Sequence, residues 1–364
     1  MTQEKAYFPA LTGLRAVAAL LVYAHHALIP SIGATPFGFL GQEGHLGVSI
    51  FFVLSGFLIG ARYSNSFTNI SLAETRRFFL HRFARLYPMY LLCTIAALLF
   101  RHDVRGISWG VNLLMAQGFF SDLAFSGIGI GWSLTAEVCF YLVAPLLLFY
   151  LPRLGVAGSV VAVVIIGALL AVAGNTFLAY GFIPDWHYFL RMTFFGRCLE
   201  FCLGIWLARH LLRMSALGLT TRVPDGLWTY TSALVLLGGM LFLNALPRLF
   251  PAYQSWLFLG TYHVLLPVVI AALLWGLCRE TTVLSRGLGS RLGQELGKGS
   301  YIFYLVHYTF GFDLLYFHVW PNRGGVLLLL AIFSVAGYYL LEAPLHKSII
   351  RAGAFTLPLK TKPL

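Results

Sequence analysis

The sequence contains few charged residues for its length. Only 10% of its 364 residues are Asp, Glu, Lys or Arg, whereas 59% are apolar, and soluble domains usually carry about 25% charged residues. The mean hydropathy of +0.80 agrees with this imbalance. The composition excludes an ordinary soluble domain. It predicts an all-α, polytopic membrane protein with a single membrane domain over residues 1–364.

Several other features are missing from the chain. We recognise no low-complexity region, no internal repeat and no appended soluble domain, and the N-terminus does not resemble a cleavable signal peptide. The five cysteines lack the spacing of a zinc site or a disulfide framework, so they are interpreted as small buried side chains and no metal is expected. The net charge is +12, but no basic domain suited to nucleic acid accompanies it.

The hydrophobic segments predict about ten transmembrane helices, because each approaches the length that a bilayer requires. They cover residues 10–30, 45–63, 86–100, 132–151, 156–174, 190–212, 227–246, 256–278, 300–320 and 324–341. Between the second and third, residues 73–88 (AETRRFFLHRFARLYP) are basic and aromatic and end at a proline. This composition predicts an amphipathic helix on the cytoplasmic surface, in contact with membrane lipids.

The basic residues predict the orientation of the chain. If both termini lie in the cytoplasm, most of the 25 Lys and Arg residues fall in the inner half of the membrane or in the inner loops. Cytoplasmic loops carry such an excess. We therefore expect a multi-pass protein of the cell inner membrane, with both termini in the cytoplasm.

Two ionisable residues, Arg15 and His26, share the first apolar segment. Their spacing of eleven residues returns to nearly the same helix face, roughly 16 Å along the axis. Ionisable groups inside a membrane are costly and usually functional. His26 can exchange protons near neutral pH and is the candidate general base; a packing role is the alternative. His25 points about 100° away and is a partner of His26 or a packing residue.

Arg82 and Arg85 form an R-x-x-R pair on one face of the predicted surface helix. Two guanidinium groups at this spacing suit a phosphate or pyrophosphate, such as the nucleotide part of coenzyme A. Anchoring to lipid headgroups is the alternative.

Other polar residues inside the apolar segments need partners. Glu137, in GWSLTAEVCFY, is expected to orient His26 as the acid of a catalytic triad does, or else to form a structural ion pair. Trp132, His25 and His307 are candidate contacts to the substrate, although His307 could equally cap a neighbouring group. Ser55 lacks the G-x-S-x-G context of a nucleophile.

Two more pairings are expected to be structural. Arg197 and Glu200 are three residues apart and can neutralise each other inside the sixth segment. Glu342, at the inner end of the last segment, is expected to pair with an Arg or Lys of the inner face.

The motifs occur in an order that resembles the acyltransferase-3 family of integral-membrane acyltransferases, which includes the O-antigen acetylases. The similarity covers about residues 7–346. It rests on LTGLRAVAALLVYAHH, GVSIFFVLSGFLI, RFARLYPMY, WSLTAEVCFY, GRCLEFCLG, SYIFYLVH and LEAP. In this resemblance, Arg15 and His26 match an R-x10-H pair, and Arg82 and Arg85 match an R-x-x-R pair.

The resemblance implies a ten-helix domain that moves an acyl group, often acetyl, from cytoplasmic acyl-CoA to a hydroxyl group. Acceptors of such families include lipopolysaccharide O-antigen, exopolysaccharides, peptidoglycan, Nod factors and macrolides. We expect Arg82 and Arg85 to bind the phosphates and Arg15 to position the donor. His26 would activate the acceptor directly or carry the acyl group as an acyl-imidazole. A transporter or flippase is the competing class, although no duplicated halves are visible.

Overall fold

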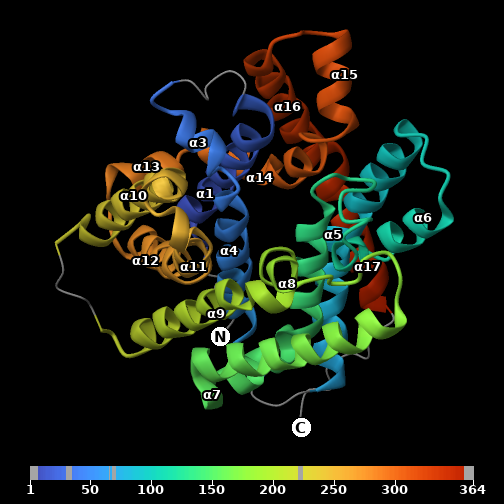
Figure 1. The fold of residues 1–364 in the computed structure, drawn as a ribbon. Helices are drawn as coiled ribbons and strands as arrows, with labels where there is room; N and C mark the ends of the chain where they lie inside the picture. The colour runs from blue at the N-terminus through green and yellow to red at the C-terminus, as the bar shows by residue number, and fades with distance from the viewer. Residues whose placement is uncertain (1–6, 30–34, 65, 68–70, 220–223, 356–364) are drawn as a thin grey trace.

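The structure is a computed structural model that describes residues 7–29, 35–64, 66–67, 71–219 and 224–355. Helices account for nearly all of the described chain (Figure 1). An isolated bridge between Phe120 and Phe182 is its only β pairing within those ranges. The prediction of an all-α protein is therefore confirmed.

Long helices form the body of the molecule. They are α1 (Pro9–Tyr23), α4 (Leu46–Tyr63), α5 (Leu72–Phe100), α7 (Gly131–Phe177), α9 (Phe194–Ala216), α10 (Leu227–Leu249), α12 (Leu266–Arg279), α14 (Arg291–Val306), α16 (Arg323–Gly337) and α17 (Ala343–Phe355). Short α-helices connect them: α3 (Gly38–Gln42), α6 (Gly106–Leu113), α8 (Trp186–Met192), α11 (Gln254–Gly260), α13 (Val283–Leu288) and α15 (Phe310–His318). The 3₁₀ turns are η2 (Gln117–Phe119) and η3 (Pro251–Tyr253), and the π-helical turns are η1 (Ala24–Leu28), η4 (Thr261–Leu265) and η5 (Tyr338–Glu342).

In the described part of the chain, 7 helices are long and apolar enough to cross a membrane, so the protein is a multi-pass membrane protein. One of them, α7, joins the fourth and fifth predicted segments across a kink at Gly155, where φ is 69°. Two other predicted segments fall short for physical reasons: α9 carries several charged residues, and α14 has only 16 residues. The number ten stays a prediction.

The predicted surface helix is not a separate element. Residues 73–88 form the first half of α5, which continues through Pro88 to Phe100. An interior proline removes a backbone hydrogen bond and crowds the preceding turn, yet α5 continues past Pro88. This half of α5 packs against α17. Phe78 is fully buried there and contacts the ring of Phe79.

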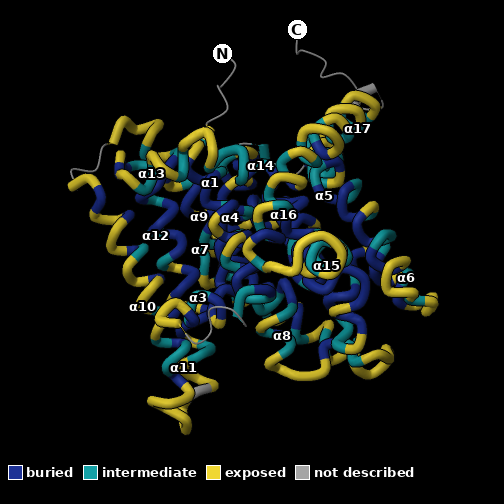
Figure 2. Tube along the Cα trace, turned by 90° about the horizontal axis from the view of Figure 1, so that it is seen from above, coloured by how far each residue is buried: buried dark blue, intermediate teal, exposed yellow. Residues whose placement is uncertain are grey.

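The two ends of the molecule carry different helices. Figure 2 shows α13 and α17 at one end and α8 and α11 at the other. The orientation rule would place the α13–α17 end in the cytoplasm. Both termini lie outside the described residues. So do four of the basic residues counted for the predicted orientation: Lys5, Arg222, Lys360 and Lys362.

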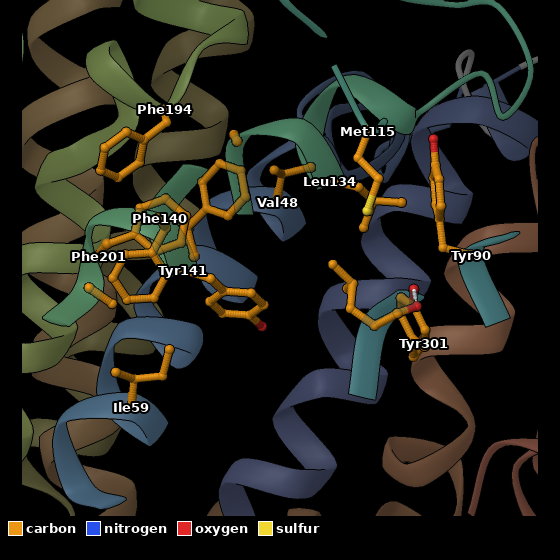
Figure 3. Packing of buried hydrophobic residues seen from close by; sticks show 14 of the residues in the cluster. Val48, Ile59, Tyr90, Met115, Leu134, Phe140, Tyr141, Phe194, Phe201 and Tyr301 are labelled. Carbon is orange, nitrogen blue, oxygen red and sulfur yellow. Dashed lines mark hydrogen bonds between the residues drawn. The ribbon is translucent and has the colours of Figure 1, made fainter. Parts of the chain in front are cut away.

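Small residues allow α4 and α9 to pack closely at the centre of the bundle. A Cβ atom added to Gly56 would collide with the carbonyl oxygen of Phe201, and one added to Gly204 would collide with that of Val53. Figure 3 shows the aromatic layer beside this contact, in which Phe140 stacks on Phe201 with ring centroids 4.2 Å apart. Close backbone approach of this kind is typical of membrane helices.

Replacing Gly204 by Val should lower the thermal stability of the purified protein, because overpacking costs roughly 1–3 kcal/mol. The matched control is Gly238→Val on α10, where nothing lies within 4 Å of an added Cβ atom. Unfolding temperatures in the same detergent measure both effects. Equal losses in the two variants would contradict the packing described for α4 and α9.

Candidate active site

Arg15 and His26 both face α14. The Nε of Arg15 donates a hydrogen bond to Ser300 Oγ at 3.3 Å. The Nδ1 of His26 lies 3.1 Å from His307 Nε2. Since Ser300 and His307 are two helical turns apart, the two ionisable side chains lie one above the other along the same interface.

A chain of hydrogen bonds determines which nitrogen of His26 carries a proton. His307 Nδ1 lies 2.9 Å from the carbonyl oxygen of Tyr304, and a carbonyl can only accept, so this nitrogen donates. In a neutral ring, His307 Nε2 is then an acceptor, and His26 Nδ1 must donate to it. The Nε2 atom of His26 keeps its lone pair available as a base.

The ring of His26 is held by the local backbone and by an aromatic neighbour. It lies in the π-helical turn η1, and such turns are frequent at functional sites. The ring of Tyr308 stacks on it, with centroids 4.3 Å apart and an interplanar angle of 21°. Phe303 stacks on His307 in the same way, at 5.7 Å and 6°. Both imidazoles therefore have fixed orientations.

Glu137 does not orient His26, contrary to our expectation. Its carboxylate accepts hydrogen bonds from Ser55 Oγ at 3.0 Å and from Tyr141 Oη at 2.5 Å. On α7, this carboxylate faces Ser55 of α4. The hydrogen-bond partner of His26 is His307 instead. The group that hydrogen-bonds His26 is therefore a second imidazole and not the carboxylate of Glu137.

Glu137 instead lines a cavity that contains three arginines. Arg15, Arg82 and Arg85 surround the same space, whose volume is about 90 Å³. Its walls also include the hydroxyl groups of Ser55 and Tyr141. The arginine side chains favour an anionic ligand in this space.

The three arginines have different partners. Arg85 forms an ion pair with Glu342, as expected for that carboxylate. Arg82 contacts the rings of Tyr63 and Tyr141, and its Nε atom is buried without a hydrogen-bond partner. Neither Arg15 nor Arg82 forms an ion pair within the described residues. These two are the groups available to a bound anion.

The cavity ends before it reaches His26. Ser133 and Tyr304 line it, but His26 and His307 do not. The hydroxyl group of Tyr304 lies 2.7 Å from that of Ser133, while the backbone carbonyl of Tyr304 holds His307. Tyr304 therefore stands between the arginine-lined cavity and the pair of imidazoles.

Two other candidate residues lie beside the site without joining it. The ring of His25 is 5.1 Å from that of His26, but its Nδ1 is bound to the carbonyl oxygens of Gly41 and Gln42, both at 3.0 Å. Trp132, at the start of α7, is half-buried and packs against the hydrophobic core. Neither residue contacts the arginine-lined cavity.

Arg197 and Glu200 form a buried ion pair whose partners all lie within the helix bundle. Both side chains are buried, and Arg197 Nε donates to Glu200 Oε1 at 2.8 Å. The same guanidinium donates to Ser49 Oγ and lies over the ring of Phe52. The charge is satisfied inside the bundle, as the spacing predicted.

Sequence reasoning missed the roles of Tyr304, Tyr141 and Tyr308. Tyr304 is 171 residues from Ser133, so no local pattern signals their contact. Tyr141 was detectable, because it lies four residues after Glu137 on one helix and such pairs share a face. No metal-binding group of three or more His, Cys, Asp or Glu residues occurs in the described ranges.

Comparison with known proteins gives the family. The family model described as "Acyltransferase domain" matches residues 8–343. The chain belongs to the acyltransferase-3 family. No solved structure matches it.

Several curated proteins resemble this acyltransferase. It is 30% identical to "Acyltransferase MdmB" of Streptomyces mycarofaciens over 366 residues, which cover 90% of this chain and 87% of that protein. It is 22% identical to "O-acetyltransferase OatA" of Staphylococcus aureus over 391 residues, or 97% and 59% of the two proteins. It is 30% identical to "Putative peptidoglycan O-acetyltransferase YrhL" of Bacillus subtilis over 164 residues, or 40% and 24%. The chain thus spans less than two thirds of the length of OatA and YrhL. Its family and its relatives show that it is a membrane O-acyltransferase.

Substituting His307 by Leu should lower kcat by roughly 10²–10⁴-fold, because His26 loses the acceptor that holds its Nδ1 proton. His307→Gln should retain more activity, since an amide oxygen can accept that proton. Acyl transfer by the purified enzyme measures both variants, with His318→Leu at an exposed position of α15 as the control. Wild-type activity in His307→Leu would contradict the hydrogen-bond chain.

Proposed function

We propose that this enzyme transfers an acyl group, most simply acetyl, from cytoplasmic acyl-CoA to a hydroxyl group of a cell-surface glycan or related acceptor. The protein would lie in the cell inner membrane with both termini in the cytoplasm. The observation that carries the proposal is the pair of imidazoles, which leaves the Nε2 lone pair of His26 free along the helix that also bears Arg15.

The arginine-lined cavity fits the phosphates of coenzyme A. The buried Nε atom of Arg82 has no hydrogen-bond partner, and a phosphate oxygen would supply one. Arg85 lies in the same wall, where Glu342 neutralises its charge, and it would bind a phosphate together with Arg82 only through its remaining N–H groups. Charge-assisted hydrogen bonds from guanidinium groups to phosphate are among the strongest in proteins. Arg15, deeper along α1, would hold the donor between the phosphates and His26.

His26 would act as general base on the acceptor. Its Nε2 atom takes the proton of the hydroxyl group while the hydroxyl oxygen attacks the thioester carbonyl carbon. When the carbon–sulfur bond breaks, the same nitrogen returns the proton to the sulfur. His307 stabilises the transient imidazolium by accepting the hydrogen bond from Nδ1. The same lone pair could instead attack the thioester and form an acyl-imidazole, which the acceptor then cleaves.

Tyr304 would control the passage between the two halves of the site. For the thioester to reach His26, the hydrogen bond between the hydroxyl groups of Tyr304 and Ser133 has to shift. A hydrogen bond of this kind contributes about 1 kcal/mol, so thermal motion can open it. The transporter or flippase expected as the competing class gains no support, because the relatives are named as acyltransferases.

Substitution of His26 by Ala should abolish transfer of label from radioactive acetyl-CoA to an acceptor, because the base or the acyl carrier is lost. The purified protein in lipid nanodiscs should still bind coenzyme A, since His26 does not line the arginine-lined cavity. Undiminished transfer in His26→Ala would remove the proposed role.

Substitution of Arg82 by Ala should raise the donor KM by about tenfold, which corresponds to about 1.4 kcal/mol. The control is Arg351→Ala, an exposed arginine of α17 at the same end of the molecule. Donor titrations with both variants separate a specific phosphate contact from a general loss of positive charge. Equal donor KM values in the two variants would contradict the phosphate site.

A further inference from the structure

A second group of polar side chains lies buried near the other end of α1, away from Arg15. We call Glu43, His45 and His263 the Glu43 cluster. Glu43 follows α3, His45 precedes α4, and His263 lies in the π-helical turn η4. Glu43 is 9% exposed and His263 is 8% exposed. Glu43 and the half-buried His45 are neighbours, and His263 lies on the far side of the Tyr262 ring, which is 4.8 Å from His45 and 4.9 Å from His263.

Four side-chain atoms of the Glu43 cluster lack hydrogen-bond partners. Glu43 Oε2, His45 Nε2 and both ring nitrogens of His263 are buried without a hydrogen bond. Glu43 Oε2 and His45 Nε2 are 3.9 Å apart, too far for a hydrogen bond. A buried polar group that is left unsatisfied destabilises the fold. These atoms therefore indicate that something outside the chain completes their hydrogen bonding.

The Glu43 cluster is adjacent to the proposed catalytic base. The ring of His25 lies 5.3 Å from His45 and 5.1 Å from His26. His45 also has an aromatic neighbour, Tyr262, whose ring lies 4.8 Å away and stacks on Phe258. A molecule that reached both His26 and the Glu43 cluster would therefore pass the ring of His25 and meet an aromatic wall.

We propose that the Glu43 cluster binds hydroxyl groups of the acceptor other than the one that is acylated. This inference rests on the proposed function and names the acceptor class: a polyhydroxylated molecule such as a hexose unit. The carboxylate of Glu43 accepts hydrogen bonds from hydroxyl groups, and the neutral imidazole of His263 offers one donor and one acceptor. His45 offers Nε2 as an acceptor, because its Nδ1 is bonded to the carbonyl oxygen of Gln42. A simple alcohol has no second hydroxyl group with which to satisfy these atoms.

The charge of Glu43 suits a neutral, hydrogen-bonding ligand. Burial raises the pKa of this carboxyl group to about 7, although the nearby Arg191 opposes the shift. Near neutral pH, both protonation states are therefore populated. Either state can hydrogen-bond a hydroxyl group, as acceptor or as donor.

The test compares acceptors with and without additional hydroxyl groups. The enzyme in lipid nanodiscs receives radioactive acetyl-CoA with octyl β-glucoside, octyl β-galactoside or 1-octanol, with each glycoside below its micellar concentration and octanol below its solubility limit. We expect at least one glycoside to have a kcat/KM about tenfold or more above that of octanol, because a site built to bind a hydroxyl group discriminates against molecules that lack it. In Glu43→Gln and His263→Phe, the glycoside KM should rise about tenfold, while octanol transfer and the donor KM stay unchanged.

Two controls make the result specific. Asp185→Asn removes a carboxylate at the same end of the molecule but keeps the cap of α8, since Asn also caps helices, and its glycoside KM should equal that of the wild type. The unfolding temperature of His263→Phe should be equal to or above that of the wild type, because two unsatisfied nitrogens are removed. This outcome separates a binding defect from misfolding.

Several results would overturn the inference while the proposed function stands. They are octanol matching both glycosides, no transfer to either glycoside while His26-dependent hydrolysis of acetyl-CoA persists, and an unchanged glycoside KM in both cluster variants. The last result would mean that ordered water alone completes the Glu43 cluster. Absence of both transfer and hydrolysis in the wild type would instead contradict the proposed function.

Discussion

The chemistry proposed for this protein depends on the hydrogen bond from His26 Nδ1 to His307 Nε2. It assigns the proton of one imidazole by means of another, whose own proton is fixed by the carbonyl oxygen of Tyr304. A neutral histidine does here what a carboxylate does in a serine-protease triad. Because the partner is uncharged, the arrangement avoids placing an ion pair beside the base in a low-dielectric interior.

The structure divides the site into two chemically different halves along one helix. The half around Arg15 is cationic and matches an anionic donor, whereas the half beyond His26 is rich in neutral hydrogen-bonding groups. Tyr304 lies at the boundary, since its side chain closes the arginine-lined cavity and its backbone orients His307. The separation is consistent with a donor and an acceptor that approach from opposite sides of a membrane.

Helical periodicity predicted the shared direction of Arg15 and His26, and local spacing predicted the pair of Arg197 and Glu200. Such relations depend on one helix alone. The partner of His26 depends on which helix packs against α1, and one sequence read on its own carries no signal for that choice. The sequence therefore offered Glu137, a carboxylate in need of a partner, while its actual partners come from α4 and from its own helix.

The most direct test of this account is to determine which ring nitrogen of His26 carries the proton. Nitrogen-15 NMR of the full-length enzyme with labelled histidine, assigned by comparison with His26→Gln, distinguishes protonated from unprotonated ring nitrogens. The account predicts a neutral His26 with its proton on Nδ1 and an unprotonated Nε2. A proton on Nε2 in the resting enzyme would contradict it, because the lone pair would then point at His307 rather than at the substrates.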